Sequence, residues 1–251
     1  MTIFYFTGTG NSLAVAKYIG GNLVSIPQVI DSGNLHFADD AVGFVFPIYW
    51  WNPPVMVRRF IDKATFESDY FFAIGTYGNI LGGAMVSLQN RAERNGVSFS
   101  YMNQVKMLDN YIPVFDMNKQ MKKLAKKNIT EELAGIASDI SGRKHLKAEA
   151  NIGRRAMTGA FNRVFKPEKS ARDYIVDEKC TKCGICSRVC PGGNVVVDER
   201  GVCFGHTCEG CLSCLHLCPQ SALHLSGEKS DKRWRNPEVS LQEIIDSNNR
   251  N

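Results

Sequence analysis

Along residues 1–110 of the 251-residue chain, short apolar runs alternate with amphipathic helical patterns. This alternation indicates parallel strands joined by crossover helices. The segment AVGFVF at Ala41–Phe46 is apolar throughout, as expected for a central strand that is covered on both faces. We therefore expect a doubly wound α/β domain with a five-stranded parallel sheet. The predicted strands are Thr2–Phe6, Leu23–Ile26, Ala41–Phe46, Tyr70–Thr76 and Val97–Leu108, and the predicted helices are Ser12–Ile19, Val55–Ile61 and Gly83–Asn95.

After this domain the helical patterns become shorter. Met117–Lys127 and Glu131–Ile140 are predicted to be helices, and Thr130 could cap the second one. Basic residues flank an apolar helix face within Gly153–Phe165, so this face could lie on a membrane surface, but packing between two domains is the commoner explanation. Pro167 ends the pattern. The four apolar residues of that face are Met157, Phe161, Val164 and Phe165.

The net charge of +5 is distributed unevenly along the chain. Residues 117–172 contain 14 Lys and Arg against 5 Asp and Glu, which gives +9, and the rest of the chain sums to −4. Such a basic segment could dock an acidic partner protein, or it could be a solvated helical face. Aromatic residues of the kind that stack bases are not interleaved with these charges, so no nucleic-acid partner is expected.

The cysteines form the most specific pattern in the sequence. All nine fall between Cys180 and Cys218, which in a reducing compartment argues for metal or cluster binding rather than disulfides. Residues 180–191 have the form C-x-x-C-x-x-C-x-x-x-C-P, and the same pattern recurs 28 residues later at 208–219. The duplication predicts a small pseudo-symmetric domain with two equivalent sites. The apolar positions after each proline also correspond, with Val195 and Val197 matching Leu223 and Leu225.

Three cysteines at this spacing let one tight loop present three thiolates to three irons of a [4Fe-4S] cluster. In bacterial two-cluster ferredoxins, which this spacing resembles, the fourth cysteine of each motif binds the other cluster. A tetrahedral zinc site is the rival interpretation, but it usually draws two cysteines from each of two separated knuckles. The ferredoxin rule assigns Cys180, Cys183, Cys186 and Cys218 to one cluster, and Cys208, Cys211, Cys214 and Cys190 to the other.

Three further residues of this region lie outside the eight predicted ligands. We expect Cys203 to be a small packed residue, because cysteine is commonly buried. His206 and His216 are interpreted as packing or hydrogen-bonding residues, since eight thiolates already complete both sites.

The start of the chain has no basic, apolar secretory signal, and no apolar run reaches the length of a membrane span. The sequence therefore predicts a cytoplasmic protein without a membrane span.

A glycine-rich loop follows the first predicted strand and reads Thr7-Gly8-Thr9-Gly10-Asn11-Ser12. Its glycines let the chain curl around an anion, its hydroxyl groups can donate to that anion, and the next helix adds free N–H groups. A P-loop would need a lysine directly after Gly10, and a dinucleotide fingerprint would need glycine where Leu13 stands. The loop suits a terminal phosphate monoester, and the alternative is a glycine-rich turn without a ligand.

This loop resembles the FMN-phosphate loop of flavodoxins, which reads T-x-T-G-N-[ST]. Flavodoxins hold the flavin ring with two further loops at the carboxyl ends of later strands. Flavodoxins usually have glycine beside the aromatic of the first ring loop, whereas this chain has Asn52, which tolerates a positive φ better than most residues. The matching positions are Pro47-Ile48-Tyr49-Trp50-Trp51 and Thr76-Tyr77-Gly78-Asn79, whose aromatics could stack on the ring or could be plain core residues.

The whole chain resembles ferredoxins in which a flavodoxin-like domain is fused to a two-cluster ferredoxin. The resemblance implies FMN, two [4Fe-4S] clusters and electron transfer to a redox partner protein. The alternative is an FMN-dependent reductase of a quinone, nitro compound or oxidant, with Tyr49, Tyr77 and Tyr111 as nearby proton donors. A redox regulator would need a DNA-binding or partner element, and the oligomeric state is not predicted. The expected domains are a flavodoxin-like domain at 1–145, a basic helical connector at 146–171, a small α+β ferredoxin domain at 172–227 and a polar tail at 228–251.

Overall fold

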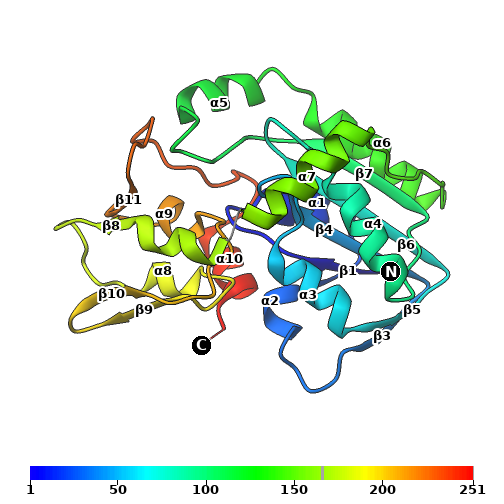
Figure 1. Ribbon diagram of the computed structural model, residues 1–251, viewed down its shortest axis with the longest axis horizontal. Coiled ribbons are helices and arrows are strands. Elements are labelled where there is room, and N and C mark those ends of the chain that lie inside the picture. The colour runs from blue at the N-terminus through cyan, green and yellow to red at the C-terminus, as the bar shows by residue number, and fades with distance from the viewer. Residues whose placement is uncertain (165–166, 251) are drawn as a thin grey trace.

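A five-stranded parallel sheet forms the centre of the N-terminal domain in the computed structural model, which describes residues 1–164 and 167–250 (Figure 1). The strands lie in the order β2-β1-β4-β6-β7, and every pairing is parallel. Counted along the chain, this is the flavodoxin-like order 2-1-3-4-5, with its switch point between β1 and β4. The predicted fold class of this domain is confirmed. The five strands are β1 (Thr2–Tyr5), β2 (Asn22–Ser25), β4 (Ala41–Pro47), β6 (Tyr70–Tyr77) and β7 (Tyr101–Lys106).

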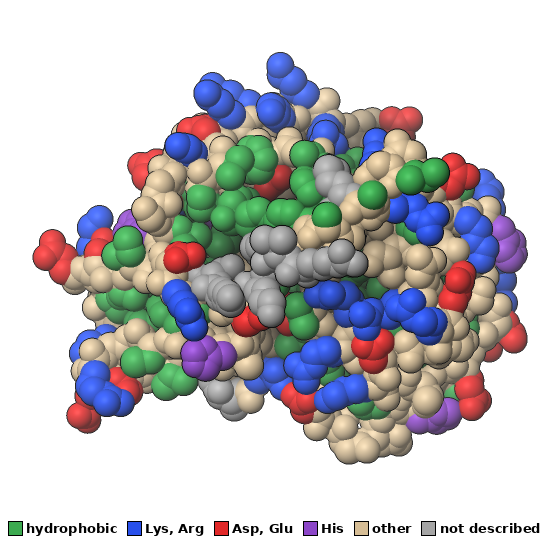
Figure 2. Space-filling view, viewed as in Figure 1, with side chains coloured by type: hydrophobic (Ala, Val, Ile, Leu, Met, Phe, Trp, Pro, Cys, Tyr) green, Lys and Arg blue, Asp and Glu red, His purple; other side chains and the backbone are tan. Residues whose placement is uncertain are grey.

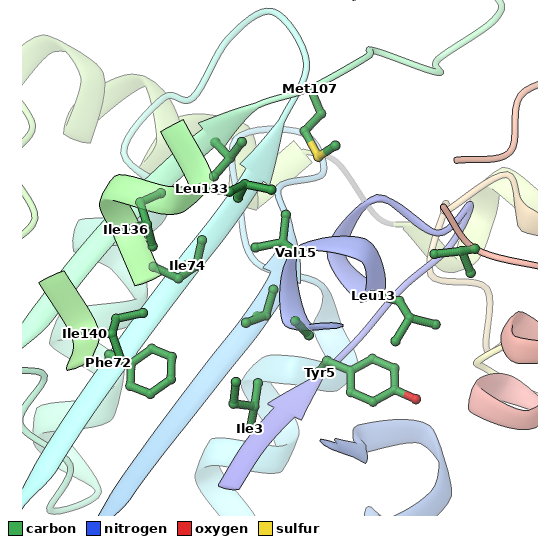
Figure 3. Close-up of a cluster of buried hydrophobic side chains, with 14 of the residues drawn as sticks. Ile3, Tyr5, Leu13, Val15, Phe72, Ile74, Met107, Leu133, Ile136 and Ile140 are labelled. Atoms are coloured by element: carbon green, nitrogen blue, oxygen red, sulfur yellow. The ribbon is translucent and has the colours of Figure 1, made fainter. Parts of the chain in front are cut away.

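Helices cover both faces of the sheet because successive residues of each strand point to opposite sides. Ile3 and Tyr5 of β1 belong to the hydrophobic core formed with α1, α6 and α10 (Figure 3). Phe4 and Phe6 belong to the opposite core, formed with α2, α3 and α4. The helices are α1 (Asn11–Ile19), α2 (Ile26–Val29), α3 (Val55–Lys63), α4 (Ala84–Arg94), α6 (Ile129–Ser141) and α10 (Leu241–Asn248).

The strands differ from the prediction at two places. The last strand is shorter than Val97–Leu108, because Gly96 adopts a φ of 78° and the next residues close the end of α4 before β7 begins. Two short strands, β3 (His36–Ala38) and β5 (Thr65–Glu67), form a separate parallel pair that the pattern did not predict.

The connecting helices follow the prediction with small shifts. α5 (Met117–Leu124) ends one turn earlier than expected, and α7 (Ile152–Val164) begins one residue earlier. The cap of α6 is Asn128 rather than Thr130, because the Asn128 side chain accepts a backbone hydrogen bond from the first turn. None of the helices within 1–164 and 167–250 is long and apolar enough to cross a membrane.

The cysteine-rich region is a small α+β unit beside the sheet domain (Figure 1). Two antiparallel strand pairs, β8 with β11 and β9 with β10, flank the two short helices α8 and α9. The internal repeat is visible in the backbone, since α8 and α9 start 28 residues apart and each follows a left-handed residue. A 3-10 helix at Pro167–Asp173 leads into this unit. Its elements are β8 (Tyr174–Val176), α8 (Ile185–Arg188), β9 (Val195–Asp198), β10 (Gly201–Phe204), α9 (Ser213–His216) and β11 (Leu223–Leu225).

The C-terminal segment lies between the sheet domain and the cysteine-rich unit, where α10 is drawn in red in Figure 1. Trp234, Asn236 and Asn248 of this segment are all buried. The helix predicted at Leu241–Ile245 continues to Asn248, and a capping box between Ser240 and Glu243 fixes its start. The expected polar tail is thus a packed part of the fold.

Candidate cluster and flavin sites

The first predicted set of four cysteines surrounds one small cavity. Cys180 and Cys183 come from the loop that leads into α8, Cys186 lies within α8, and Cys218 comes from the second motif, just after α9. Pro219 lines the same cavity, where it turns the chain away from the thiol. The structure therefore brings together the interleaved set that the ferredoxin rule assigned. The name "outer set" is used below for these four residues.

The second predicted set is also brought together. Burial raises the pKa of the Cys211 and Cys214 thiols well above its ordinary value, and charge on Cys190 and Cys208 raises it further. Buried thiols that lie this close together lose their protons only if nearby cations stabilise the thiolates. The irons of a cluster would be such cations. The name "inner set" is used for Cys190, Cys208, Cys211 and Cys214. Within 1–164 and 167–250, no three His, Cys, Asp or Glu side chains are grouped tightly enough for one metal ion.

Backbone N–H groups point at sulfur in both sets. The Asn194 N–H donates to Cys190 Sγ at 3.2 Å, and the Ala222 N–H donates to Cys218 Sγ at 3.3 Å, at equivalent positions of the repeat. The Gly210 N–H donates to Cys208 Sγ at 3.4 Å. Hydrogen bonds to sulfur stabilise negative charge on the thiolates, and this tunes the reduction potential of a bound cluster.

A separate cavity of about 390 Å³ lies at the carboxyl ends of the sheet strands, within the range of roughly 300–1,000 Å³ typical of cofactor sites. All the predicted flavin-loop residues except Gly10 line it. Gly10 is the loop residue just before α1 and forms its N-cap. Its φ of 98° lies in the left-handed region that favours glycine. The residues brought together are Thr7, Gly8, Thr9, Asn11, Ser12, Pro47, Ile48, Tyr49, Trp50, Trp51, Thr76, Tyr77, Gly78 and Asn79.

The glycine-rich loop has the chemistry that a phosphate group needs. The hydroxyl groups of Thr7, Thr9 and Ser12 are buried, and Ser12 Oγ lies 2.8 Å from Thr76 Oγ1 of β6. No side chain caps the N-terminus of α1, so the N–H groups of its first turn are available to an anion together with the helix dipole. The residues present therefore fit a phosphate monoester without any Lys or Arg.

The first ring loop is a two-residue hairpin with a strained turn. Tyr49 and Asn52 exchange backbone hydrogen bonds of 2.9 and 3.0 Å, and the central residues Trp50 and Trp51 have φ values of 52° and 63°. Such a turn requires positive φ at both central positions and normally contains Asn-Gly, so each tryptophan costs roughly 1–3 kcal/mol. The two tryptophans, rather than Asn52, adopt the positive φ values in this loop.

Aromatic contacts hold this strained turn in place. Phe161 of α7 stacks on Trp50 with ring centroids 5.8 Å apart and lies 5.0 Å from Trp51. Tyr111 meets Trp50 edge to face at 4.5 Å. Of the apolar face predicted for Gly153–Phe165, Phe161 thus packs at the cavity, while Phe165 and the side chains of Met157 and Val164 lie outside the described residues.

The loop after β7 completes the cavity, and of its residues only Tyr111 was expected near the site. Asp109 Oδ2 accepts hydrogen bonds from the Asn79 N–H and from Asn79 Nδ2, both at 3.1 Å. Asn110 Nδ2 donates to Thr9 Oγ1 at 2.9 Å. Gly78 allows the close approach of Asp109, since an added Cβ would lie 2.3 Å from the Asp109 Cβ. The signal available in the sequence was only the position of this loop at a strand end.

The cysteine-rich unit forms one wall of the same cavity. Gly210 and Leu212, which alternate with ligands of the inner set, line it. Ser213 Oγ donates to the Gly8 carbonyl oxygen at 2.8 Å, and a Cβ built on Gly8 would lie 3.2 Å from the Cys211 Cβ. The phosphate-type loop and the inner set are therefore in direct contact.

Comparison with known proteins identifies the C-terminal unit. The 4Fe-4S binding domain family matches residues 173–195. An uncharacterized ferredoxin of Methanocaldococcus jannaschii is 36% identical over 72 residues, which cover 26% of this chain and 94% of that protein. The chain belongs to the ferredoxin family. The pyruvate synthase subunit PorD of the same organism is 36% identical to this ferredoxin over 58 residues, or 22% of the chain, and the chain spans 66% of that subunit.

The N-terminal domain of this ferredoxin also has similar solved structures. A two-electron reduced flavodoxin of Megasphaera elsdenii is matched over 49% of the chain and 96% of the flavodoxin, with 20% identity and a TM-score of 0.30. With so low a TM-score, the flavodoxin-like assignment depends on the strand order given above.

The C-terminal segment of the ferredoxin contacts both of its sites. Asn248 is fully buried, and its Nδ2 donates to the Thr7 carbonyl at 3.0 Å and to the Val189 carbonyl at 3.2 Å. Trp234 Nε1 and Asn236 Nδ2 both donate to Asn11 Oδ1. Sequence reasoning missed these residues because their partners lie more than 50 residues away and leave no local pattern.

The three residues outside the ligand sets have different environments. His216 is buried, and its Nδ1 accepts from the Trp234 N–H while its Nε2 donates to the Asn110 carbonyl, as a hydrogen-bonding residue should. The packed position expected for Cys203 is wrong, because it lies on the outer side of the β9–β10 pair opposite exposed Val196. His206 is exposed as well.

The basic segment at residues 117–172 presents exposed lysines on and just after α5. Figure 2 shows Lys and Arg side chains gathered over this helix, above a hollow lined by hydrophobic side chains. Lys127 is an exception, since its Nζ donates to the Lys106 carbonyl at the end of β7 at 2.8 Å. The exposed residues are Lys119, Lys122, Lys123 and Lys126.

Proposed function

We propose that this ferredoxin transfers electrons between two [4Fe-4S] clusters and an FMN bound to the same chain, and on to a redox partner protein. The observation that supports this most is the single cavity of about 390 Å³ in which three flavin-type loops meet the loop of the inner set. A fold with separate, unrelated sites would have no reason to place a cluster loop in the wall of a flavin-sized cavity.

The residues of this chain would hold the cofactors as follows. The outer and inner sets would bind one cluster each, and Thr7–Ser12 would bind the phosphate of FMN with hydroxyl groups and the N-terminus of α1. Trp50 and Trp51 would wall the flavin ring on one side and exclude water from it. Each cluster can carry one electron, and FMN can carry one or two, so the pair connects one-electron and two-electron chemistry.

The reductase of a small molecule remains the second candidate, because the outer part of the cavity has an apolar wall. Ile80 and Val114 line it and are each 56% exposed. The nearby phenols are weak proton donors, however, since burial raises the pKa of Tyr77 and Tyr111 above its ordinary value. Electron transfer to a protein needs no such donor, which favours the first candidate.

Cofactor analysis after anaerobic purification tests the proposal. We expect eight irons, eight sulfides and one FMN per chain, and visible absorption that dithionite bleaches. The variant Cys211→Ser should lose about half of the iron, because it removes one ligand of one cluster. Cys203→Ser is the matched control and should keep all of it, since Cys203 is exposed and outside both sets. Zinc in place of iron, or clusters without flavin, would contradict the proposal.

A turnover assay separates the two candidates. The holoprotein is supplied with a reduced ferredoxin donor and a panel of quinones and nitroaromatics, and reduction of each compound is followed. A carrier should reduce them all slowly, whereas substantial turnover of one compound alone would favour the reductase.

The partner would be an acidic protein that docks on the exposed lysines of α5. Electron transfer with such a partner should slow as salt is added, because salt screens the attraction between the two charged surfaces and so slows their association. The screening length is about 8 Å at physiological ionic strength. Replacing Lys119, Lys122 and Lys123 by Glu should remove most of that salt dependence. A rate that does not change with salt in the unmodified protein contradicts an acidic partner.

A further inference from the structure

The two copies of the cysteine motif have the same backbone but different surroundings. Equivalent positions adopt the same left-handed conformation, with φ values of 56° at Lys182 and 67° at Gly210, and of 76° at Gly184 and 59° at Leu212. The loops that hold the outer and inner sets thus turn through left-handed residues at the same two positions. Differences between them arise from side chains and contacts.

Those differences all concern contact with the flavodoxin-like domain. Residues 182–185 of the first copy are exposed or half-buried, whereas the equivalent residues 210–213 of the second copy are all buried. Cys183 is exposed, and its equivalent Cys211 is buried against Gly8. The duplicated unit therefore places one cluster loop at the surface and the other against the cavity.

The substitutions between the copies match these two environments. Where the first copy has Thr181, the second has Glu209, which is buried and accepts a hydrogen bond from the Met56 N–H at the start of α3. Where the first copy has Ile185, the second has Ser213, which donates to the Gly8 carbonyl. Each polar change in the inner loop therefore has a partner in the flavodoxin-like domain.

Leu212 is the most informative of these positions. The first copy uses Gly184, which adopts a positive φ without strain, whereas the second copy has a leucine there, in a conformation that a branched side chain rarely adopts. The Leu212 side chain is buried and lines the flavin cavity between Cys211 and Ser213. A strained residue at such a place indicates a function that glycine would not serve.

The two sets are also close to one another. Cys186 of the outer set belongs to the same buried core as Cys190 and Cys214 of the inner set. Electrons can therefore pass from the surface to the cavity along one line of neighbouring sites: outer set, inner set, flavin cavity.

We propose that the cluster of the inner set is the direct electron partner of FMN within the same chain, with Leu212 filling the space between them, and that the cluster of the outer set exchanges electrons with the redox partner. This inference rests on the proposed function. Each step moves one electron: an external one-electron reductant reduces the outer cluster, which reduces the inner cluster, which reduces the flavin. Two passages deliver two electrons, and protons from solvent balance the charge on the flavin.

Rapid mixing of the holoprotein with the reduced methyl viologen radical tests this order. We expect cluster absorbance to bleach first, at a rate that depends on viologen concentration. Flavin absorbance should then fall with a rate constant that stays the same when the protein is diluted tenfold, because the electron does not leave the chain. A flavin phase that slows in proportion to dilution, or that precedes the cluster phase, would overturn the inference.

Two glycine substitutions sharpen the test, and both relieve a positive φ. Leu212→Gly also removes a buried side chain, so its folded state is checked by circular dichroism before mixing. Leu212→Gly gives the inner loop the residue of the first copy, and it should slow the flavin phase several-fold because it leaves a gap between cluster and flavin. Lys182→Gly is the matched control in the outer loop and should leave the flavin phase unchanged. Equal flavin phases in both variants would remove the role assigned to Leu212.

Iron, sulfide and FMN content are measured for each protein before mixing. Protein without FMN would defeat the proposed function itself. Protein that contains both clusters and FMN, but whose flavin phase depends on dilution, would defeat only this inference, because electrons would then pass between chains.

Discussion

The two cofactor regions of this ferredoxin are built in opposite ways. The cluster ligands come from two short segments of one duplicated unit, residues 180–190 and 208–218. The cavity proposed for FMN is walled by segments that range from Thr7 to Leu212 and include Phe161 of the connector. Cluster binding is therefore a local property of eight thiols, whereas the cavity is a property of the whole chain. Changes at the cluster ligands should therefore act mainly on the ferredoxin domain, whereas changes at distant positions should affect the cavity.

Removal of iron should have the largest effect and should stay local. Three ligands, Cys186, Cys190 and Cys214, are among the eleven buried residues of the core that includes the interior of the ferredoxin domain, so loss of the clusters should disturb the packing of this core. We expect iron chelation to cost the domain several kcal/mol, as removal of a structural metal does. Hydrogen exchange should rise in β8 to β11.

The sheet provides the internal control for that experiment. Its two cores contain many fully buried aliphatic and aromatic residues, such as Phe44, Phe72 and Ile74, whereas Cys186, Cys190 and Cys214 belong to a third core. Protection of β1, β4 and β6 should therefore persist after chelation. Simultaneous loss of protection in these strands would show that the two regions fold as one unit and would break the comparison.

Asn248 joins the two regions, and its replacement should have the next largest effect. Asn248→Leu keeps a similar volume but leaves the carbonyls of Thr7 and Val189 without this donor in a buried place. The expected loss in free energy of unfolding is about 1–3 kcal/mol. FMN retention should fall as well, because the Thr7 carbonyl belongs to the phosphate-type loop. Chemical unfolding and flavin release during gel filtration measure the two effects.

Gln242→Leu on the same helix is the control for Asn248→Leu. Gln242 is exposed, and its Nε2 donates only to Asp246 one turn later among the contacts described. Its replacement should change stability by less than about 0.5 kcal/mol, as surface substitutions usually do. Equal effects of the two changes would mean that Asn248 acts only through the stability of α10.

The same contrast explains what the sequence could predict. The ligand sets were predictable because a repeated motif with fixed spacing determines them, and Thr7–Ser12 was predictable because a strand end and a helix start frame it. Asn248 and Trp234 were not, since hydrogen bonds to partners some 60 and 223 residues away leave no periodic pattern. Cys203 was misplaced because burial of cysteine is a statistical tendency, whereas strand register decides which side it faces.

Phe161 tests the contribution of the connector to the cavity. Phe161→Ala removes the ring that stacks on Trp50 and contacts Trp51, and aromatic pairs of this kind contribute about 0.5–1.5 kcal/mol each. FMN affinity should weaken by roughly tenfold, because the strained turn loses the contacts that hold it at the cavity. Fluorescence titration of flavin-free protein with FMN measures this, and Ile152→Ala at the start of α7, where Ile152 is 84% exposed, should leave affinity unchanged.

Glu243 should give the smallest effect, with a defined pH dependence. Its carboxylate accepts from Lys17 Nζ and from the N–H and hydroxyl of Ser240, and these contacts lower the pKa of Glu243 to about 2. Because the folded pKa is depressed, the stabilisation is fully present above the unfolded value of about 4.5 and is lost as pH falls toward 2. The pair is partly exposed, so solvent screening limits the loss in Glu243→Gln to about 0.5 kcal/mol. Hydrogen exchange of α10 should show this difference from wild type, constant between about pH 8 and about pH 5.

The control Glu238→Gln should show none, since Glu238 is exposed. A difference that already changes between pH 8 and pH 6 would mean that another group, and not this capping carboxylate, ties the C-terminal helix to α1.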